Sequence, residues 1–212
     1  MAEFRIIVLQ TQLEYVRVNV LLTQINSHFF YHTLNAIQAL IVLEPDAAYK
    51  MTEDFSRFIR FKVDSVGVQH GLVPFKDEMR SVKAFADINV VQLGERLKME
   101  YDVFDADFMI PVLTIQPIVE NAIVHGVKPL VGGGTVRVSL RQDGEFYEVT
   151  VSDDGVGFSL DEENSKASVG IANIKTRMGK HPGCSITVES APGKGTTVVL
   201  RYPADLAKEC AT

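Results

Sequence analysis

The sequence predicts an α+β protein, in which an N-terminal helical hairpin precedes a two-layer α/β sandwich with a mixed sheet. A seven-residue hydrophobic rhythm runs through residues 9–41, and this is the spacing of packed helices. From residue 97 onward, apolar and polar residues alternate in short runs, as they do in half-buried strands. Hydrophobic residues make up 46% and charged residues 23% of the 212, which is enough apolar material for a packed core. We expect two domains, 1–70 and 71–212.

The first segment is predicted to be a long helix that ends near residue 44. Pro45 disfavours helical geometry in Glu44, so a break is expected before a second helix with an apolar stripe from Ala48 to Lys62. Two helices joined by a short turn form a hairpin. One hairpin cannot bury such a seam alone, so two copies are expected to form a dimeric four-helix bundle. The seam consists of Leu9, Leu13, Val16, Val20, Thr23, Ser27, Phe30, Leu34, Ile37 and Ile41.

A linker and a third helix are expected between the hairpin and the sheet. Residues 67–74 are interpreted as the linker. Pro74 favours the first turn of a helix, whose apolar face extends over residues 75–93. Residues 97–103 then alternate between apolar and charged side chains, which predicts the first strand of the sheet.

The next part of the chain predicts a helix and a β-hairpin. Residues 111–126 are expected to be helical, with the main part beginning at Pro117. Residues 136–141 and 147–151 alternate like strands and flank the turn signal Asp143-Gly144. These two strands are therefore predicted to pair with each other.

The last part predicts a loop, a short helix and two more strands. Residues 159–168 are polar and are expected to form a loop, and a helix is expected over 171–178. Residues 186–188 and 198–200 are predicted to be strands on either side of a turn at 193–195. The C-terminal half is thus expected to be a mixed sheet covered by helices.

Composition and charge exclude several classes of protein. The formal net charge of −6 argues against a general nucleic-acid binder, which carries a basic surface. The two cysteines, Cys184 and Cys210, lack the spacing of a metal site and are interpreted as plain thiols. No apolar run approaches the ~20 residues that a membrane helix needs. The chain is therefore expected to be a cytosolic piece of a longer protein.

A first candidate site begins at Asp153, in the run Asp153-Asp154-Gly155-Val156-Gly157 directly after a predicted strand. Glycines allow positive φ angles and let the backbone approach a flat ligand closely. A carboxylate at the strand end can accept a hydrogen bond from a purine amino group. The same pattern also occurs in ordinary turns, so taken alone it leaves both interpretations open.

A second candidate site lies on the predicted helix that carries Glu120 and Asn121. The amide oxygen of Asn121 is a hard ligand of the kind that suits Mg²⁺, and the adjacent carboxylate can accept a proton. A Glu-Asn pair on a helix is usually solvated surface, but the neighbours of this pair are apolar. His125 and Gly126 close the helix, and His125 is interpreted first as a capping side chain.

Two further glycine-containing segments are candidates for binding phosphate. Gly170 and Asn173 follow the polar loop and are expected to open a helix, where backbone N–H groups favour anions and the loop can act as a lid. A plain junction between a loop and a helix is the alternative. The segment 193–196, which includes Gly195 and Thr196, is equally compatible with a simple hairpin turn.

The fifth candidate is His28, in the middle of the first helix. It lies one position away from the seam residue Ser27, and shares a polar face with Gln24, His32 and Asn35. An exposed imidazole is a nucleophile towards phosphorus, and a useful fraction is neutral near pH 7. Because His28 and His32 are four residues apart, a metal-binding pair is an alternative, but no third ligand has a suitable spacing. A solvated histidine without a role is the remaining alternative.

These five features occur in order along residues 20–203, and together they resemble one known family. They are similar to the GHKL nucleotide-binding fold preceded by the phosphoacceptor domain of LytS-type sensor histidine kinases. The matching blocks are 24–35 for the phosphoacceptor, 116–126 for the N box, 153–157 for the G1 box and 190–196 for the final glycine-threonine block.

The resemblance implies a function and a role for each candidate residue. His28 would take the γ-phosphoryl group of ATP and pass it to an aspartate of a response regulator, and Glu120 would accept the imidazole proton. Asn121 would hold Mg²⁺, and Asp153 would bind adenine. The cofactor-binding set is Asn121, His125, Asp153, Gly155, Gly157, Gly170, Asn173, Gly195 and Thr196. The resemblance also implies a homodimer without nucleic acid as a partner, and a cytoplasmic domain attached to a membrane sensor region outside this chain.

The chain departs from the family pattern at five positions, namely Ser27, His32, Val124, Asp154 and Ser168. The family has proline at 27, asparagine at 32 and 154, a basic residue at 124 and commonly glycine at 168. These departures motivate a second hypothesis, in which the chain is a catalytically weak nucleotide-binding scaffold. A third hypothesis is a GHKL ATPase or serine kinase, in which Glu120 activates water or a hydroxyl group.

Overall fold

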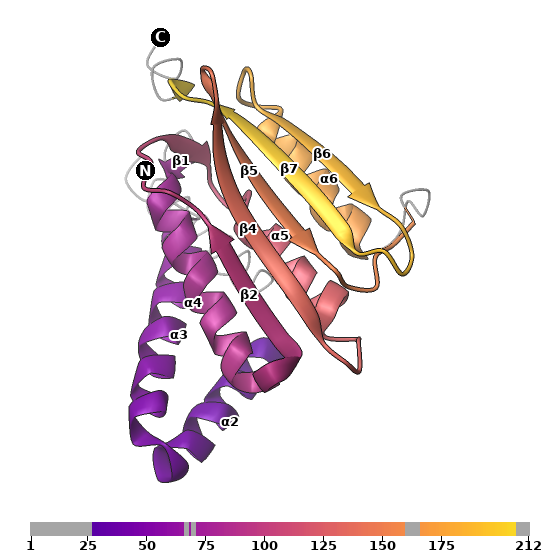
Figure 1. Ribbon diagram of the computed structural model, residues 1–212. Helices are drawn as coiled ribbons and strands as arrows, with labels where there is room; N and C mark the ends of the chain where they lie inside the picture. The colour runs from indigo at the N-terminus through magenta and orange to yellow at the C-terminus, as the bar shows by residue number, and fades with distance from the viewer. Residues whose placement is uncertain (1–26, 66–67, 69–70, 160–165, 207–212) are drawn as a thin grey trace, which may run out of the picture. The chain divides into compact units, whose positions relative to one another are not determined.

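The computed structural model describes residues 27–65, 68, 71–159 and 166–206. Contacts between Cα atoms divide the chain into two compact units, Met1–Gly67 and Val68–Thr212. The first unit contains a helical hairpin and the second contains a mixed sheet with helices (Figure 1). The predicted α+β fold is therefore confirmed, while the functions assigned to 1–70 and 71–212 stay a prediction.

The hairpin consists of α2 (Ser27–Leu43) and α3 (Pro45–Ser65), with Glu44 between them. The predicted break is confirmed. Pro45 opens α3, where its missing N–H group is not needed by the helix. The seam residues that precede Ser27 lie outside the described residues.

Aromatic side chains hold the two helices of the hairpin together. The ring centroid of Phe29 lies 5.2 Å from that of Phe58, and Phe30 lies 5.1 Å from Phe55, both in edge-on geometry. Edge-to-face aromatic pairs contribute about 0.5–1.5 kcal/mol each beyond the area that they bury. Phe30 is a predicted seam residue, and Phe55 and Phe58 belong to the predicted stripe of the second helix.

Part of the predicted seam is exposed in the single chain. Leu34 and Ile41 are 39% and 59% exposed, and Val42 and Leu43 beside them are 83% and 75% exposed. Single exposed apolar side chains are common, but a row of them on one helix leaves apolar surface that the hairpin does not bury.

Two short strands contradict two details of the sequence analysis. Strand β1 (Leu72–Pro74) pairs antiparallel with β3 (Met109–Pro111). Residues 72–74 are therefore not a linker, and the predicted helix does not begin at Pro111. A strand of three residues is too short to show an alternating pattern, so the pairing rather than the local sequence defines it.

The third helix is α4 (Phe75–Leu93), as predicted, and Pro74 is its N-cap residue. Its core face is apolar, with Met79, Val82 and Ala86 all buried. Unexpectedly, three polar residues are buried on the same helix as well: Glu78, Ser81 and Asn89. Because buried polar groups need hydrogen-bond partners, these residues indicate specific contacts with the rest of the unit.

Five strands form the mixed sheet, in the order β2-β4-β5-β7-β6. β2 runs parallel to β4, and all other neighbours pair antiparallel. Helices α4, α5 and α6 all lie on one face of this sheet (Figure 1). The strands are β2 (Leu97–Asp102), β4 (Gly134–Asp143), β5 (Phe146–Asp153), β6 (Ser185–Ser190) and β7 (Thr196–Pro203), which confirms all five predicted strands.

The core lies between the sheet and the helices. Alternate residues of the central strands face this core and are at most 2% exposed: Val136, Val138, Leu140, Val149, Val151, Val198, Leu200 and Tyr202. The intervening residues form the opposite face, where Arg137 pairs with Glu100 and Arg141 with Asp102. Exposed pairs of this kind contribute only about 0–1 kcal/mol, so burial on the helix side stabilises the sheet.

The helices that border the later site are α5 (Gln116–Asn121), the π-helical turn η3 (Ala122–Val127) and α6 (Lys166–Met178). The predicted start of the main helix near Pro117 is confirmed. The predicted loop over 159–168 is wrong for residues 166–168, which belong to α6. The polar composition of that segment hid the helix, because only its later residues carry an apolar stripe.

Glu78 acts as the cap of α5 from a different helix. Its two carboxylate oxygens accept the backbone N–H groups of Leu113, Ile115 and Gln116 at 2.8, 2.7 and 3.0 Å. Burial raises the pKa of Glu78 above its ordinary value of 4.5, while these N–H groups and the charge of Arg177 oppose that shift. A helix start whose N–H groups would otherwise be unsatisfied is thus held by a buried carboxylate.

Arg177 of α6 holds the same turn from the other side. One guanidinium nitrogen, Nη1, donates to the carbonyl oxygens of Val112 and Leu113 at 2.7 and 2.8 Å. Leu113 has a φ of 57°, a left-handed conformation that costs a non-glycine residue roughly 1 kcal/mol or more. Glu78 and Arg177 therefore maintain a turn that the local sequence disfavours.

Among the helices of the described residues, none combines the length and apolar character needed to cross a bilayer.

Candidate functional site

A cavity of about 240 Å³ lies between α5 with η3 on one side and the ends of β5 and β7 on the other. Concave sites of this kind, apolar with a few polar groups, are typical for small ligands and cofactors. It is lined by Ile118, Asn121, Ala122, His125, Gly126, Val151, Asp153, Gly157, Phe158, Ile171, Thr196 and Val198. Five of the predicted site residues line this one cavity: Asn121, His125, Asp153, Gly157 and Thr196.

The helical wall of the cavity follows from residue spacing. Ile118, Asn121, Ala122 and His125 are spaced as i, i+3, i+4 and i+7, so they share one face of α5 and η3. The chain then widens into π-helical geometry, with the N–H of Lys128 donating to the carbonyl of Ile123 at 2.9 Å. Single π-helical turns inside α-helices are frequent at functional sites. His125, at the end of this helical wall, is exposed to solvent.

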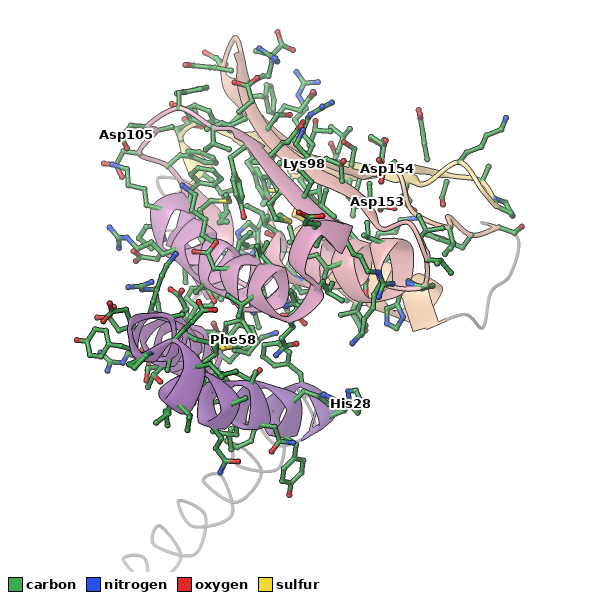
Figure 2. The ribbon with its side chains drawn as sticks, turned by 60° about the horizontal axis from the view of Figure 1, so that its bottom comes forward. His28, Phe58, Lys98, Asp105, Asp153 and Asp154 are labelled. Carbon is green, nitrogen blue, oxygen red and sulfur yellow. The ribbon has the colours of Figure 1, made fainter. Side chains whose placement is uncertain are left out.

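Asp153 ends strand β5 (Figure 2). In the sheet register it pairs with Thr196 of β7. Its Oδ1 accepts the backbone N–H of Gly155 at 2.9 Å. Burial, and to a smaller extent the charge of Asp154, raise the pKa of Asp153 to about 6, while the N–H groups of Gly155 and Thr196 oppose the shift. The carboxylate is therefore ionised at neutral pH but close to titration.

The turn after Asp153 is pressed onto the end of η3. The N–H of Val156 donates to the carbonyl oxygen of Gly126 at 3.0 Å, and a Cβ at Gly126 would lie 2.6 Å from Asp153 Oδ1. A Cβ at Gly155 would overlap the backbone carbonyl of Gly126. These glycines are needed for close approach, which an isolated turn would not require.

The hairpin between β6 and β7 borders the cavity next to the turn after Asp153. Gly157 and Gly195 have positive φ angles of 59° and 74°, and a Cβ at either position would overlap backbone atoms. Ser190 Oγ accepts the N–H of Phe158 at 2.9 Å and donates to the carbonyl oxygen of Gly195 at 3.1 Å. The segment 193–196 is thus more than a hairpin turn, because it forms one wall together with the turn after Asp153.

Glu120 and Asn121 have different surroundings. Glu120 does not line the cavity, and its Oε1 accepts a hydrogen bond from Gln116 Nε2 at 2.8 Å. Asn121 lines the cavity and lies beside α6, where a Cβ at Gly170 would be 3.1 Å from its Nδ2. The missing side chain of Gly170 therefore keeps α6 close to the Asn121 amide.

One expectation about α6 is wrong, while the predicted role of Asn173 stays a prediction. Gly170 does not open the helix, because α6 begins at Lys166 and places Gly170 in its second turn. Asn173 is exposed and is not among the residues that line the cavity. The helix N-terminus predicted to bind phosphate at Gly170 is therefore absent at that residue.

His28 lies in the other unit, on α2, and is exposed as predicted (Figure 2). Its ring centroid lies 4.0 Å from that of His32, at an angle of 44° between the planes. The spacing of four residues brings the two imidazoles together on one helix face. Within the described residues, no three His, Cys, Asp or Glu side chains form a metal-binding group.

The sequence analysis does not predict the apolar residues that line the cavity, nor the buried polar residues of α4. Ile118 and Ala122 could have been found from their helical spacing to Asn121, and Val151 and Val198 from strand alternation. No sequence signal pointed to the buried polar residues of α4, because they interrupt an apolar face at single positions.

Two family models match the chain. The histidine kinase model matches residues 16–97, and the model of histidine kinase-, DNA gyrase B- and HSP90-like ATPases matches residues 110–206. The histidine kinase domain of the blue-light activated kinase EL346 from Erythrobacter litoralis aligns with a TM-score of 0.52 at 20% identity, covering 77% of each chain. This likeness concerns the fold alone.

Two relatives carry sensor kinase names. Sensor histidine kinase YpdA of Escherichia coli strain K12 is 35% identical over 136 residues, covering 64% of this chain and 24% of YpdA. Sensor protein LytS of Streptococcus agalactiae serotype V is 29% identical over 198 residues, covering 88% of this chain and 34% of LytS. The chain thus spans less than half of either relative. The two family matches and these relatives show that the chain belongs to the LytS-type sensor histidine kinases and contains both their histidine kinase domain and their GHKL ATPase domain.

Proposed function

We propose that this chain is an ATP-dependent protein-histidine kinase, which binds Mg-ATP in the cavity beside α5 and phosphorylates His28. In this reaction the bond between the γ-phosphorus and the β,γ-bridging oxygen breaks, and a bond from phosphorus to an imidazole nitrogen of His28 forms. ADP leaves, and the imidazole proton passes to Glu120. The phosphoryl group then moves from His28 to an aspartate of a response regulator.

The observation that carries this proposal is the cavity itself, which both Asp153 and Asn121 line. The ionised carboxylate of Asp153 suits the amino group of adenine, and the apolar side chains between suit the purine ring. Gly155 and Gly157 shape this end by allowing close backbone approach. Thr196 and His125 complete the lining on either side, and Gly195 fixes the backbone that precedes Thr196.

Asn121 is the residue that fits Mg²⁺, because an amide oxygen is a hard ligand and Mg²⁺ commonly takes only one or two protein ligands. When bound, Mg²⁺ neutralises charge on the phosphates during transfer. Gly170 leaves the Asn121 amide accessible beside α6. Asn173 has no role in this proposal, because it is exposed and outside the cavity lining.

The partners follow from the surfaces and from the family. The exposed seam residues Leu34 and Ile41 support a homodimer, in which two hairpins bury their apolar faces against each other. We further propose a receiver domain as the acceptor of the phosphoryl group, and a membrane sensor region joined to this cytoplasmic core.

The test is incubation of the chain with Mg²⁺ and γ-labelled ATP, followed by mapping of the labelled residue under alkaline conditions. The label is expected on His28, and His28→Ala should abolish acid-labile protein phosphate. His181→Ala, which removes a histidine of the other unit, should retain the label. Label that persists on His32 in His28→Ala would reassign the acceptor.

The same assay separates the two competing functions. Val124, in place of a basic residue, favours a binding module without transfer, and tight ATP binding with no label would support that alternative. Steady phosphate release without phosphohistidine would instead support an ATPase or a serine kinase.

A further inference from the structure

We propose that Gln116 is a positioning residue, which is oriented by Ser81 and in turn holds the carboxylate of Glu120. This inference rests on the proposed role of Glu120 as the proton acceptor. It concerns two residues, Ser81 and Gln116, that do not line the nucleotide cavity.

A continuous pair of hydrogen bonds runs from α4 to Glu120. Ser81 Oγ donates to Gln116 Oε1 at 2.8 Å, and Gln116 Nε2 donates to Glu120 Oε1 at 2.8 Å. Ser81 and Gln116 are both 0% exposed, whereas Glu120 is half-buried. The chain of bonds therefore begins in the core and ends at the residue that must reach the reacting imidazole.

The chemistry of the three groups fixes the direction of both bonds. An ionised carboxylate only accepts hydrogen bonds, so Gln116 must turn its NH₂ group towards Glu120. Its carbonyl oxygen then faces Ser81, whose hydroxyl group can donate. A flipped amide would place an oxygen against the carboxylate. Ser81 and Glu120 together thus select one orientation of the Gln116 side chain.

The main chain of Gln116 is held by the same helix. Its N–H donates to Glu78 Oε1 at 3.0 Å, and Glu78 lies three residues before Ser81 on one face of α4. One helix therefore fixes both the backbone and the amide of Gln116. The spacing of four residues between Gln116 and Glu120 lets the amide reach the next turn of α5.

A proton acceptor works only when it is held in place. A misplacement of about 1 Å can reduce a reaction rate by roughly 10²-fold, and a positioned base contributes about 10²–10⁴-fold. Loss of the Gln116 bond removes one of the contacts that orient the Glu120 carboxylate. The rate of phosphorylation should therefore fall, while the affinity for nucleotide should not.

The experiment measures single-turnover autophosphorylation of the chain at saturating Mg-ATP, together with the Kd for Mg-ATP. Gln116→Met, which keeps the length but removes the donor, should lower the rate about 10–100-fold with the Kd changed less than about threefold. Ser81→Ala, a milder change, should lower the rate about 3–10-fold. Tyr202→Phe is the matched control, because it also removes one buried hydroxyl group, bonded to Thr114 at 2.9 Å, but has no link to Glu120. Its rate should equal that of the wild type.

Combination with Glu120→Gln separates the possible outcomes. If Gln116 acts through Glu120, Gln116→Met should cause no further loss in the Glu120→Gln background. Equal losses in both backgrounds, or a rate and a Kd that change together, would overturn the inference in favour of a merely structural role. Wild-type rates in both Gln116→Met and Ser81→Ala, with Glu120→Gln slow, would also overturn it while leaving the proposed function intact. A wild-type rate in Glu120→Gln itself would instead remove Glu120 from the proposed reaction.

Discussion

The helical hairpin and the nucleotide unit present their reactive groups in opposite ways. His28 lies exposed on α2, with His32 as its aromatic neighbour. Asp153 lies at the centre of an interlocked wall, where glycines let three backbone segments meet. A nucleophile that must meet more than one partner benefits from exposure, while a ligand site depends on fixed geometry. Substitutions in the sheet unit should therefore change the affinity for ATP, and substitutions in the hairpin should change dimerisation.

The largest effect is expected at Gly155, where the backbone of the cavity wall leaves no space for a side chain. Gly155→Ala would place a methyl group against the backbone of Gly126, and overpacking of this kind costs about 1–3 kcal/mol or more. The Kd for ATP, measured by calorimetry, should rise about 100-fold, which is the change that a cost near 3 kcal/mol corresponds to. Gly132→Ala is the control, because nothing lies within 4 Å of a Cβ there, and its Kd should not change. Equal effects of the two changes would mean that the wall is not rigid.

A smaller effect is expected at the exposed seam of the hairpin. The double variant Leu34→Ser, Ile41→Ser should weaken dimerisation by roughly 30-fold if the dimer buries about 20 Å² of each of the four side chains, because buried apolar area contributes about 25 cal/mol per Å². Analytical ultracentrifugation measures this directly. ATP affinity should not change, and Val42→Ser, next to the seam, should leave dimerisation as it is. A dimer of unchanged strength would place the interface elsewhere.

The smallest effect concerns the protonation of Asp153. Because its pKa is about 6, roughly a tenth of the carboxylate is ionised at pH 5. If adenine binding needs the ionised form, affinity for ATP should fall about tenfold between pH 7.5 and pH 5. ATP titrates in the same range, so Asp153→Asn is the reference, and only the difference between the two proteins reports Asp153. Parallel profiles would exclude this carboxylate from the pH dependence.

The raised pKa of Asp153 also affects the stability of the fold. Fold stability favours the protonated carboxyl group, whereas the proposed binding of adenine favours the ionised one. The pKa of folded Asp153 lies above its ordinary value of 3.8, so its contribution to stability is most favourable below pH 3.8 and is lost as pH rises through about 6. Asp153→Asn should therefore raise the melting temperature at pH 7 while it weakens nucleotide binding. A lower melting temperature would indicate that the charged form is stabilised by contacts other than those described above.

Long helices and strands with a clear hydrophobic period are predictable from the sequence, and short or polar ones are not. Strands β4 and β5 follow from their alternation and from the turn signal between them, and α3 follows from its stripe after Pro45. The sequence predicts a linker at the residues of β1, because three residues show no hydrophobic period. The start of α6 was missed, because its first residues are polar and resemble a loop.

The candidate site shows the same limit. Asp153, Asn121 and Thr196 were found because local motifs bring specific chemistry to the ends of elements, and the structure brings them to one cavity. The hydrogen bonds from Ser81 to Gln116 and from Glu78 to α5 join residues 35 to 38 positions apart. Such contacts depend on how α4 packs against α5, and a single sequence carries no local signal for that packing.

The turn before α5 has a consequence for the divergence of related chains. Glu78 and Arg177 both form hydrogen bonds with main-chain atoms of residues 112–116. These bonds therefore do not depend on which side chains residues 112–116 carry. During evolution the apolar side chains of 112, 113 and 115 are free to interchange with others of similar volume. An acid at 78 and a guanidinium at 177 should persist together, even among homologues too distant to share the sequence between them.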